Sequence, residues 1–266
     1  MIEYIEKKYI QKNSVEKRDY QINLANQAMN ENCVVVLPTG LGKTTIALHV
    51  IAEYLSRESS RILFLAPTRV LVNQHFNFLK QNLTIDEITL ITGEDSVEKR
   101  TELWDSRIIC ATPEVARNDL NRKIITSQQF SLVIFDEVHR TTGDYAYSSI
   151  AEHFENSNTR LLGMTATLPS EQEKATEILT RLRISSVAER TDNSPDVKPY
   201  IQETKTEWIN VELPPELKSI QKFLKLSLDE RYDTLRKNGL SINNQQSLSA
   251  LLRLRPFVLT KSRKSA

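Results

Sequence analysis

Short apolar runs alternate with stretches of helical spacing over the first 180 residues or so. We expect strands at 33–37, 61–66, 87–91, 107–111, 131–137 and 160–166. We expect helices at 43–55, 69–81, 96–104, 113–120, 145–154 and 170–182. The strand runs are almost continuously apolar, which is typical of parallel strands buried on both faces. The pattern therefore predicts an α/β fold, a parallel sheet flanked by helices.

The pattern changes after about residue 190. A polar stretch with two prolines at 191–200 predicts a loop, and 206–213 has the alternation of an edge strand that the next two prolines end. Apolar residues then recur at helical spacing over 216–237. We therefore expect two domains, 1–205 and a helical appendage at 206–266, whose tail from 241 has one short apolar patch around 248–254.

Composition is that of a soluble globular protein. The chain has 266 residues with 35 Lys and Arg against 34 Asp and Glu, so a net charge of +1 provides no overall attraction for a polyanion. No apolar run approaches the roughly 18 residues of a membrane span, and the charged N-terminal residues do not resemble a signal peptide. We expect a cytoplasmic, intracellular protein without membrane contact, in which Cys33 and Cys110 are buried thiols.

Glycine is scarce in this chain, which directs attention to the few that remain. There are 6 glycines, whereas average usage of about 7% predicts roughly 19. Gly40 and Gly42 lie two residues apart in the segment Leu37–Thr45, between a predicted strand and a predicted helix. This loop is the strongest candidate for a functional site.

The sequence of the loop, LPTGLGKTT, is suited to holding phosphate. A glycine-bearing turn before a helix directs backbone N–H groups and the positive helix end at one point, where an anion can bind. Lys43 can reach the β and γ phosphates, and the Thr44 hydroxyl can bind Mg²⁺. Leu37 stands where the strict motif has glycine. The expected nucleotide-binding residues of the loop are Thr39, Gly40, Leu41, Gly42, Lys43, Thr44 and Thr45.

Two acidic residues close the fifth apolar run, at the end of a predicted strand. Asp136 can hold the metal, and Glu137 can polarise the attacking water in phosphoryl transfer to water. His139 is suited to relaying the nucleotide state to a third element, which contains Thr165 and Thr167. We therefore expect catalysis by Glu137 and Asp136 together with Lys43.

In order and spacing, five segments resemble motifs I, Ia, Ib, II and III of superfamily 2 helicases. These segments are LPTGLGKTT (37–45), APTRVL (66–71), ATPE (111–114), DEVH (136–139) and TAT (165–167). LITGEDSVEKR (90–100), FDEVHRTTGDYAY (135–147) and NSPDVKPY (193–200) resemble the archaeal Hef branch, which is akin to the FANCM and Mph1 translocases. The resemblance covers roughly residues 15–240 and departs from the family at Val138 and Thr165, both conservatively.

The resemblance implies a RecA-like P-loop NTPase lobe that uses ATP and Mg²⁺ and in which Gln21 reads adenine. The family has a second RecA-like lobe whose arginine motif contains Gly-Arg, and the only glycine after residue 163, Gly239, precedes Leu. We therefore expect that lobe to be absent from this chain. Residues 206–266 resemble the start of the helical, thumb-like insert that grips duplex DNA in Hef-like proteins. The resemblance also places nucleic-acid contacts at Arg69 and Thr112.

Three functions stay open on the sequence. The first is one lobe of an ATP-dependent DNA helicase or translocase that acts on forked or branched DNA in repair or replication-fork processing. The second is an RNA-dependent ATPase of the Dicer type, since contacts that track a backbone do not identify the sugar. The third is a nucleotide-binding or DNA-binding module without hydrolysis. The basic residues of the tail are a further, weaker candidate DNA contact: Arg253, Arg255, Lys261, Arg263 and Lys264.

Overall fold

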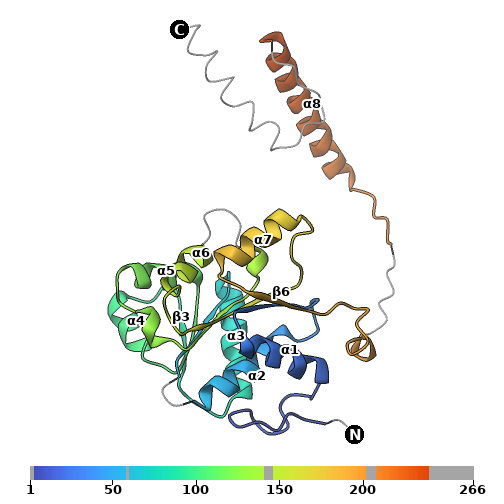
Figure 1. The fold of residues 1–266 in the computed structure, drawn as a ribbon. Helices are drawn as coiled ribbons and strands as arrows, with labels where there is room; N and C mark the ends of the chain where they lie inside the picture. Colours follow the sequence, from blue (N-terminus) through green and yellow to red (C-terminus); the bar gives the residue numbers. More distant parts are fainter. Residues whose placement is uncertain (1–2, 58–59, 141–145, 202–207, 240–266) are drawn as a thin grey trace. The chain divides into compact units, whose positions relative to one another are not determined.

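The computed structural model describes residues 3–57, 60–140, 146–201 and 208–239 (Figure 1). The chain divides into two compact units, Met1–Gln202 and Glu203–Ala266, which we describe separately. The boundary expected at 205/206 lies outside the described residues, as does the tail from 241 with its apolar patch and its basic residues. In the described part of the chain, no helix is both long and apolar enough to cross a membrane.

The first unit is built on a seven-stranded sheet in which all of the paired strands are parallel. In space the strands follow the order β3-β4-β2-β5-β6-β1-β7. The expected α/β fold is therefore confirmed. The strands are β1 (Cys33–Val36), β2 (Ile62–Leu65), β3 (Ile88–Ile91), β4 (Ile108–Ala111), β5 (Leu132–Phe135), β6 (Arg160–Thr165) and β7 (Ser186–Glu189).

Helices cover both faces of this sheet, as the continuous apolar strands require. Helices α1–α3 contribute to the core on one face, and α4–α7 contribute to the core on the other. The helices are α1 (Asp19–Asn30), α2 (Lys43–Leu55), α3 (Arg69–Asn82), α4 (Val97–Leu103), α5 (Pro113–Asn121), α6 (Ala146–His153) and α7 (Gln172–Arg181). Short 3-10 helices occupy Ser127–Gln129, Val138–Arg140 and Lys198–Tyr200.

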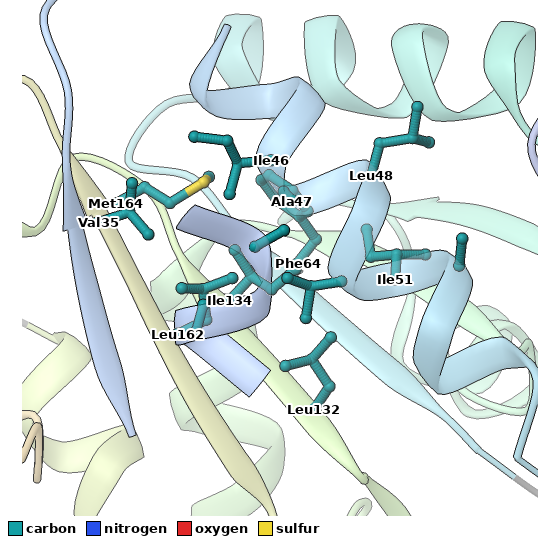
Figure 2. Packing of buried hydrophobic residues seen from close by; sticks show 14 of the residues in the cluster. Val35, Ile46, Ala47, Leu48, Ile51, Phe64, Leu132, Ile134, Leu162 and Met164 are labelled. Carbon is teal, nitrogen blue, oxygen red and sulfur yellow. The ribbon is translucent and has the colours of Figure 1, made fainter. Parts of the chain in front are cut away.

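Successive strand residues point to opposite faces, so each strand supplies both cores. In β1, Val35 belongs to the α1–α3 side, whereas Val34 and Val36 belong to the α4–α7 side. Figure 2 shows Ile46 and Ala47 of α2 packed with side chains of β1, β2, β5 and β6 on the first of these sides. Each large side chain that is fully buried in this way contributes about 1.5–3 kcal/mol of stability. This packing fixes the start of α2 against the carboxyl edge of the sheet.

A buried ion pair joins α4 to α5 within the second core. The Arg100 guanidinium donates to both carboxylate oxygens of Asp119, each at 2.9 Å, and the Trp104 indole N–H donates to the same carboxylate at 2.9 Å. A third bond runs from Arg100 to the backbone oxygen of Asp95 at 2.7 Å. This pair therefore ties the loop after β3 to α5.

The expected edge strand at 206–213 is wrong for the residues that the structure describes. Residues 208–213 pair with no described strand, and Trp208, Ile209 and Val211 are exposed. A strand needs a partner for its backbone N–H and C=O groups, and alternation in one segment does not reveal whether a partner exists. The second unit contains α8 (Pro215–Lys237), close to the helix expected at 216–237.

Candidate nucleotide-binding site

Three candidate segments lie side by side at the carboxyl edge of the sheet. The loop 37–42 follows β1, Asp136 follows β5, and Thr165 ends β6. Because β6 lies between β5 and β1, the three segments are neighbours, and Leu37 N–H donates to the Thr165 backbone oxygen at 3.0 Å. In open α/β sheets, ligands bind in the crevice outside the carboxyl ends of the strands.

The loop after β1 has the backbone that phosphate binding requires. Gly40 and Gly42 have φ of +83° and +84°, a region that other residues rarely adopt. Gly42 is the N-cap of α2, and its backbone oxygen accepts from the N–H groups of Thr45 and Ile46. A glycine cap has no side chain to occupy the amides of the first turn, so the N–H groups of Lys43 and Thr44 stay available to an anion.

Lys43 lies at the centre of the candidate site. Its Nζ donates to the backbone oxygen of Leu37 at 2.9 Å. Burial lowers the pKa of Lys43 below its usual value, and the carboxylates of Glu137 and Asp136 oppose that shift. The structure thus brings Lys43 into the electrostatic range of the acidic pair.

We expect Gly42→Ala to destabilise the domain more than Gly40→Ala, because the two glycines share a positive φ and differ in surroundings. A Cβ at Gly42 would collide with the Gln21 side-chain amide, whereas a Cβ at Gly40 meets nothing within 4 Å. The strained backbone alone costs about 1–3 kcal/mol in each variant. Urea unfolding of both variants measures the difference, and equal losses would contradict a close approach of Gln21 to the loop.

Gln21 contacts the loop through one end of its amide. Its Nε2 donates to the Leu41 backbone oxygen at 3.0 Å, and the Tyr20 hydroxyl donates to the same oxygen at 2.7 Å. The other end of the amide, Oε1, is buried without a hydrogen-bond partner among the described residues. An unpaired buried acceptor is costly, and it suits an adenine because the exocyclic amine of that base is a donor. The residues therefore fit the nucleotide that the sequence predicts.

The two acidic residues occupy different environments. Asp136 is buried, with 4% of its surface exposed, and its carboxylate lies 2.7 Å from Nε2 of His75. Glu137 has a backbone φ of +52°, which is unusual for a residue with a side chain. Strain of this kind persists only where the surroundings impose it and is frequent at functional sites.

A short chain of polar contacts links Glu137 to the end of β6. His139 Nδ1 lies 3.2 Å from Glu137 Oε2 and 3.1 Å from Thr165 Oγ1. The Thr165 hydroxyl donates to the Thr167 backbone oxygen at 2.9 Å, so it accepts from His139. The three residues expected to couple the acidic pair to the third element, His139, Thr165 and Thr167, are therefore brought together beside Glu137.

The candidate magnesium ligands are hard oxygen donors on neighbouring elements. Thr44 is the second residue of α2, and Asp136 follows β5. Mg²⁺ commonly keeps several waters and binds proteins through one or two oxygen ligands together with substrate phosphates. These two residues fit that requirement, although no hydrogen bond joins them within the described part of the chain.

The candidate nucleic-acid contacts lie at the carboxyl edge of the same sheet, after β2 and β4. Arg69 begins α3 after the N-cap Thr68, and its guanidinium forms an ion pair with Glu94, both side chains being exposed. Thr112 is the N-cap of α5 and is buried. Sequence reasoning missed Glu94 as the partner of Arg69 and missed His75 beside Asp136. A histidine on the buried face of the α3 pattern was the available signal for the second contact.

Comparisons with known proteins agree with this geometry. The model of the DEAD/DEAH box helicase family matches residues 18–175. The crystal structure of the Pyrococcus furiosus Hef helicase domain is similar, with a TM-score of 0.72 and 34% identity, over 94% of this chain and 54% of that one. The RecA-like helicase fold expected from the sequence is therefore confirmed.

Curated relatives are much longer than this chain. A Methanocaldococcus jannaschii protein provisionally named ATP-dependent RNA helicase MJ1505 is 42% identical over 239 residues, which are 89% of this chain and 31% of that protein. The ATP-dependent DNA helicase MPH1 of Saccharomyces cerevisiae is 36% identical over 220 residues, 80% of this chain and 22% of MPH1. The chain thus spans less than a third of these relatives. It belongs to the DEAD/DEAH box helicase family and resembles the Hef and MPH1 branch within it.

Proposed function

We propose that this domain binds ATP with Mg²⁺ and hydrolyses it when a second RecA-like lobe completes the site, to drive movement along forked or branched DNA in repair or replication-fork processing. One observation carries the proposal. Lys43 and the amide of Gln21 each contact one loop with two positive-φ glycines, and the carboxylates of the acidic pair act electrostatically on Lys43. A loop of this kind holds a triphosphate, and the acidic pair supplies what hydrolysis needs.

Each residue of the loop has a role in holding the nucleotide. Backbone N–H groups of Thr39–Thr44 surround the phosphates, and the Lys43 ammonium neutralises their charge. The acceptor Oε1 of Gln21 selects the amine of adenine, which is a donor. Guanine has a carbonyl at the same position, and its oxygen is an acceptor that cannot bond to Oε1. The loop therefore accounts for affinity, and Gln21 of α1 accounts for base preference.

The acidic pair divides the chemistry between metal and water. Thr44 and Asp136 hold Mg²⁺, which neutralises charge on the phosphates when it is bound. The Glu137 carboxylate orients the attacking water and accepts its proton. Because His139 contacts both Glu137 and Thr165, a change at the γ phosphate reaches the end of β6 through these two contacts.

Nucleic acid lies over the half of the edge formed by β3, β4 and β2. Arg69 and the amides at the start of α5, after Thr112, are suited to phosphate oxygens, which position a strand without reading its bases. The names of MPH1 and of fml1 from Schizosaccharomyces pombe, both DNA helicases, favour DNA. The name of the M. jannaschii relative favours RNA, so the experiment must include both.

The salt dependence of nucleic-acid binding tests this assignment. Each neutralised phosphate contributes about 0.7–0.9 to the slope of log K against log salt, so two or three contacts predict a slope near 2. We expect Arg69→Ala to reduce the slope by about 1. Labelled single-stranded DNA, forked DNA and RNA of matched length are titrated between low and moderate salt. Arg181→Ala, a partly exposed arginine of α7 that pairs with Glu177, is the control.

The outcomes distinguish the alternatives. A steep slope that Arg69→Ala leaves unchanged would move the main DNA contact to the second unit or the basic tail. Clearly tighter binding of RNA than of forked DNA would favour the RNA-dependent alternative. We expect no strand separation by this chain alone, because movement requires two lobes that open and close on ATP; unwinding by the isolated chain would contradict the one-lobe interpretation.

A further inference from the structure

A buried histidine contacts the candidate metal ligand from outside the residues used so far. His75 lies on α3, and its side chain and that of Asp136 are only 7% and 6% exposed. Nε2 of the imidazole is 2.7 Å from Oδ2 of Asp136. A contact this short between two buried polar groups is a hydrogen bond. It joins α3, the helix after β2, to the residue that follows β5.

The surroundings fix which atom holds the proton. A carboxylate oxygen only accepts, so Nε2–H is the donor. The other ring nitrogen, Nδ1, has no hydrogen-bond partner among the described residues. When Nε2 carries the hydrogen, Nδ1 carries none, so no N–H group of the ring is buried without a partner. The imidazole also packs on the Phe64 ring, with centroids 4.5 Å apart. The ring is therefore held in one orientation with its donor directed at Asp136.

The backbone of Asp136 is held by separate bonds. Its N–H donates to the Leu65 oxygen at 2.9 Å, and its backbone oxygen accepts from the Tyr147 hydroxyl at 2.8 Å. These bonds place the backbone of the residue but do not determine where its carboxylate oxygens lie. Within the part of the chain that the structure describes, the only hydrogen bond to the carboxylate itself comes from His75.

We propose that His75 is a positioning residue for the metal-dependent step: the imidazole holds Oδ2 of Asp136, so that Oδ1 is presented to the cation and its waters. This inference rests on the proposed function, because it assigns Asp136 to the metal. Partners of this kind orient a ligating carboxylate, and their loss typically weakens metal affinity or activity by about 10–100-fold.

The test measures metal binding directly, with Mn²⁺ as the probe for the Mg²⁺ site. Free Mn²⁺ is counted by its electron paramagnetic resonance signal while the 266-residue chain is titrated with Mn²⁺, with the chain in excess over ATP so that little unbound nucleotide competes for the cation. ATP affinity in EDTA is measured in parallel. The variants are His75→Phe, which keeps a ring against Phe64 without the donor, and His75→Gln, whose Nε2 can occupy the position of the imidazole Nε2. The exposed His153→Phe on α6 is the control.

We expect His75→Phe to weaken Mn²⁺ binding about 10–100-fold, with ATP affinity in EDTA unchanged. His75→Gln should recover most of the loss, and the control should match the wild type. A purely structural role for His75 would lower the unfolding temperature and would leave the metal titration of the folded variant unchanged. If His75→Phe does not fold, His75→Asn replaces it, because the shorter amide cannot reach Oδ2.

Two failures are distinguishable. A wild-type chain that binds no ATP would overturn the proposed function itself. A wild-type chain that binds ATP and Mn²⁺, with a folded His75→Phe or His75→Asn of equal Mn²⁺ affinity, would overturn the role of His75 and leave the proposed function standing. A folded His75→Gln as weak as His75→Phe would overturn the donor role of Nε2.

Discussion

Lys43→Ala is expected to lower the affinity for Mg·ATP by at least about 10- to 100-fold. The ammonium shares one triphosphate with the loop amides, and partial dipoles do not replace a full charge. Hydrogen bonds to charged groups contribute about 1.5–3 kcal/mol each, so loss of this contact lowers affinity about 10- to 100-fold or more. Because Lys43 is partly buried and bonded to Leu37, its position is fixed before the ligand arrives.

Calorimetry of the wild type and the variant provides the measurement. Lys99→Ala is a matched control, because Lys99 is an exposed lysine that pairs with Asp95 on the far half of the edge. The control should bind ATP as the wild type does. If Lys43→Ala bound ATP with the affinity of the wild type, the assignment of the loop as a phosphate-binding site would be wrong.

Glu137→Gln is expected to separate binding from hydrolysis. The amide has the shape of the carboxylate and the same strained backbone, but it is a far poorer acceptor for the proton of the attacking water. General base catalysis typically contributes 10²–10⁴-fold, so turnover should fall by about that factor while ATP affinity stays within about twofold of the wild type. The retained backbone also keeps His139 within reach of Thr165.

Turnover is measured with forked DNA and an added second lobe, and affinity is measured by calorimetry on the same preparations. Glu173→Gln, on the exposed surface of α7, is the control. If Glu137→Gln loses affinity and turnover equally, Glu137 supports the fold or the metal, and its division of roles with Asp136 is wrong.

The fold was largely predictable because its strands are buried on both faces. Continuous apolar runs located six of the strands, and the helical spacing of 43–55 matched α2 residue for residue. β7 was missed because Ser186–Glu189 has one buried residue, Ala188, and no apolar run. α1 was not predicted as a helix; its buried face includes the polar Gln21 and two small residues, Ala25 and Ala28.

The candidate site was predictable where chemistry is local in the sequence. Glycines before a lysine indicate a phosphate loop, and two acids after an apolar run indicate a strand end. Contacts between distant segments were not predictable in this way. Tyr20 with Leu41, and His75 with Asp136, are joined only by the strand order and by the packing of α1 and α3 on the sheet. No spacing rule in a single sequence contains that information.

One titration tests the central claim, that the loop after β1 binds ATP through its own residues. The wild-type chain is titrated with ATP and with GTP in the presence of Mg²⁺. We predict one saturable site that prefers ATP by about tenfold or more, because the carbonyl of guanine would leave Oε1 of Gln21 unpaired against a second acceptor. The absence of saturable ATP binding, or equal affinity for GTP, would contradict the account.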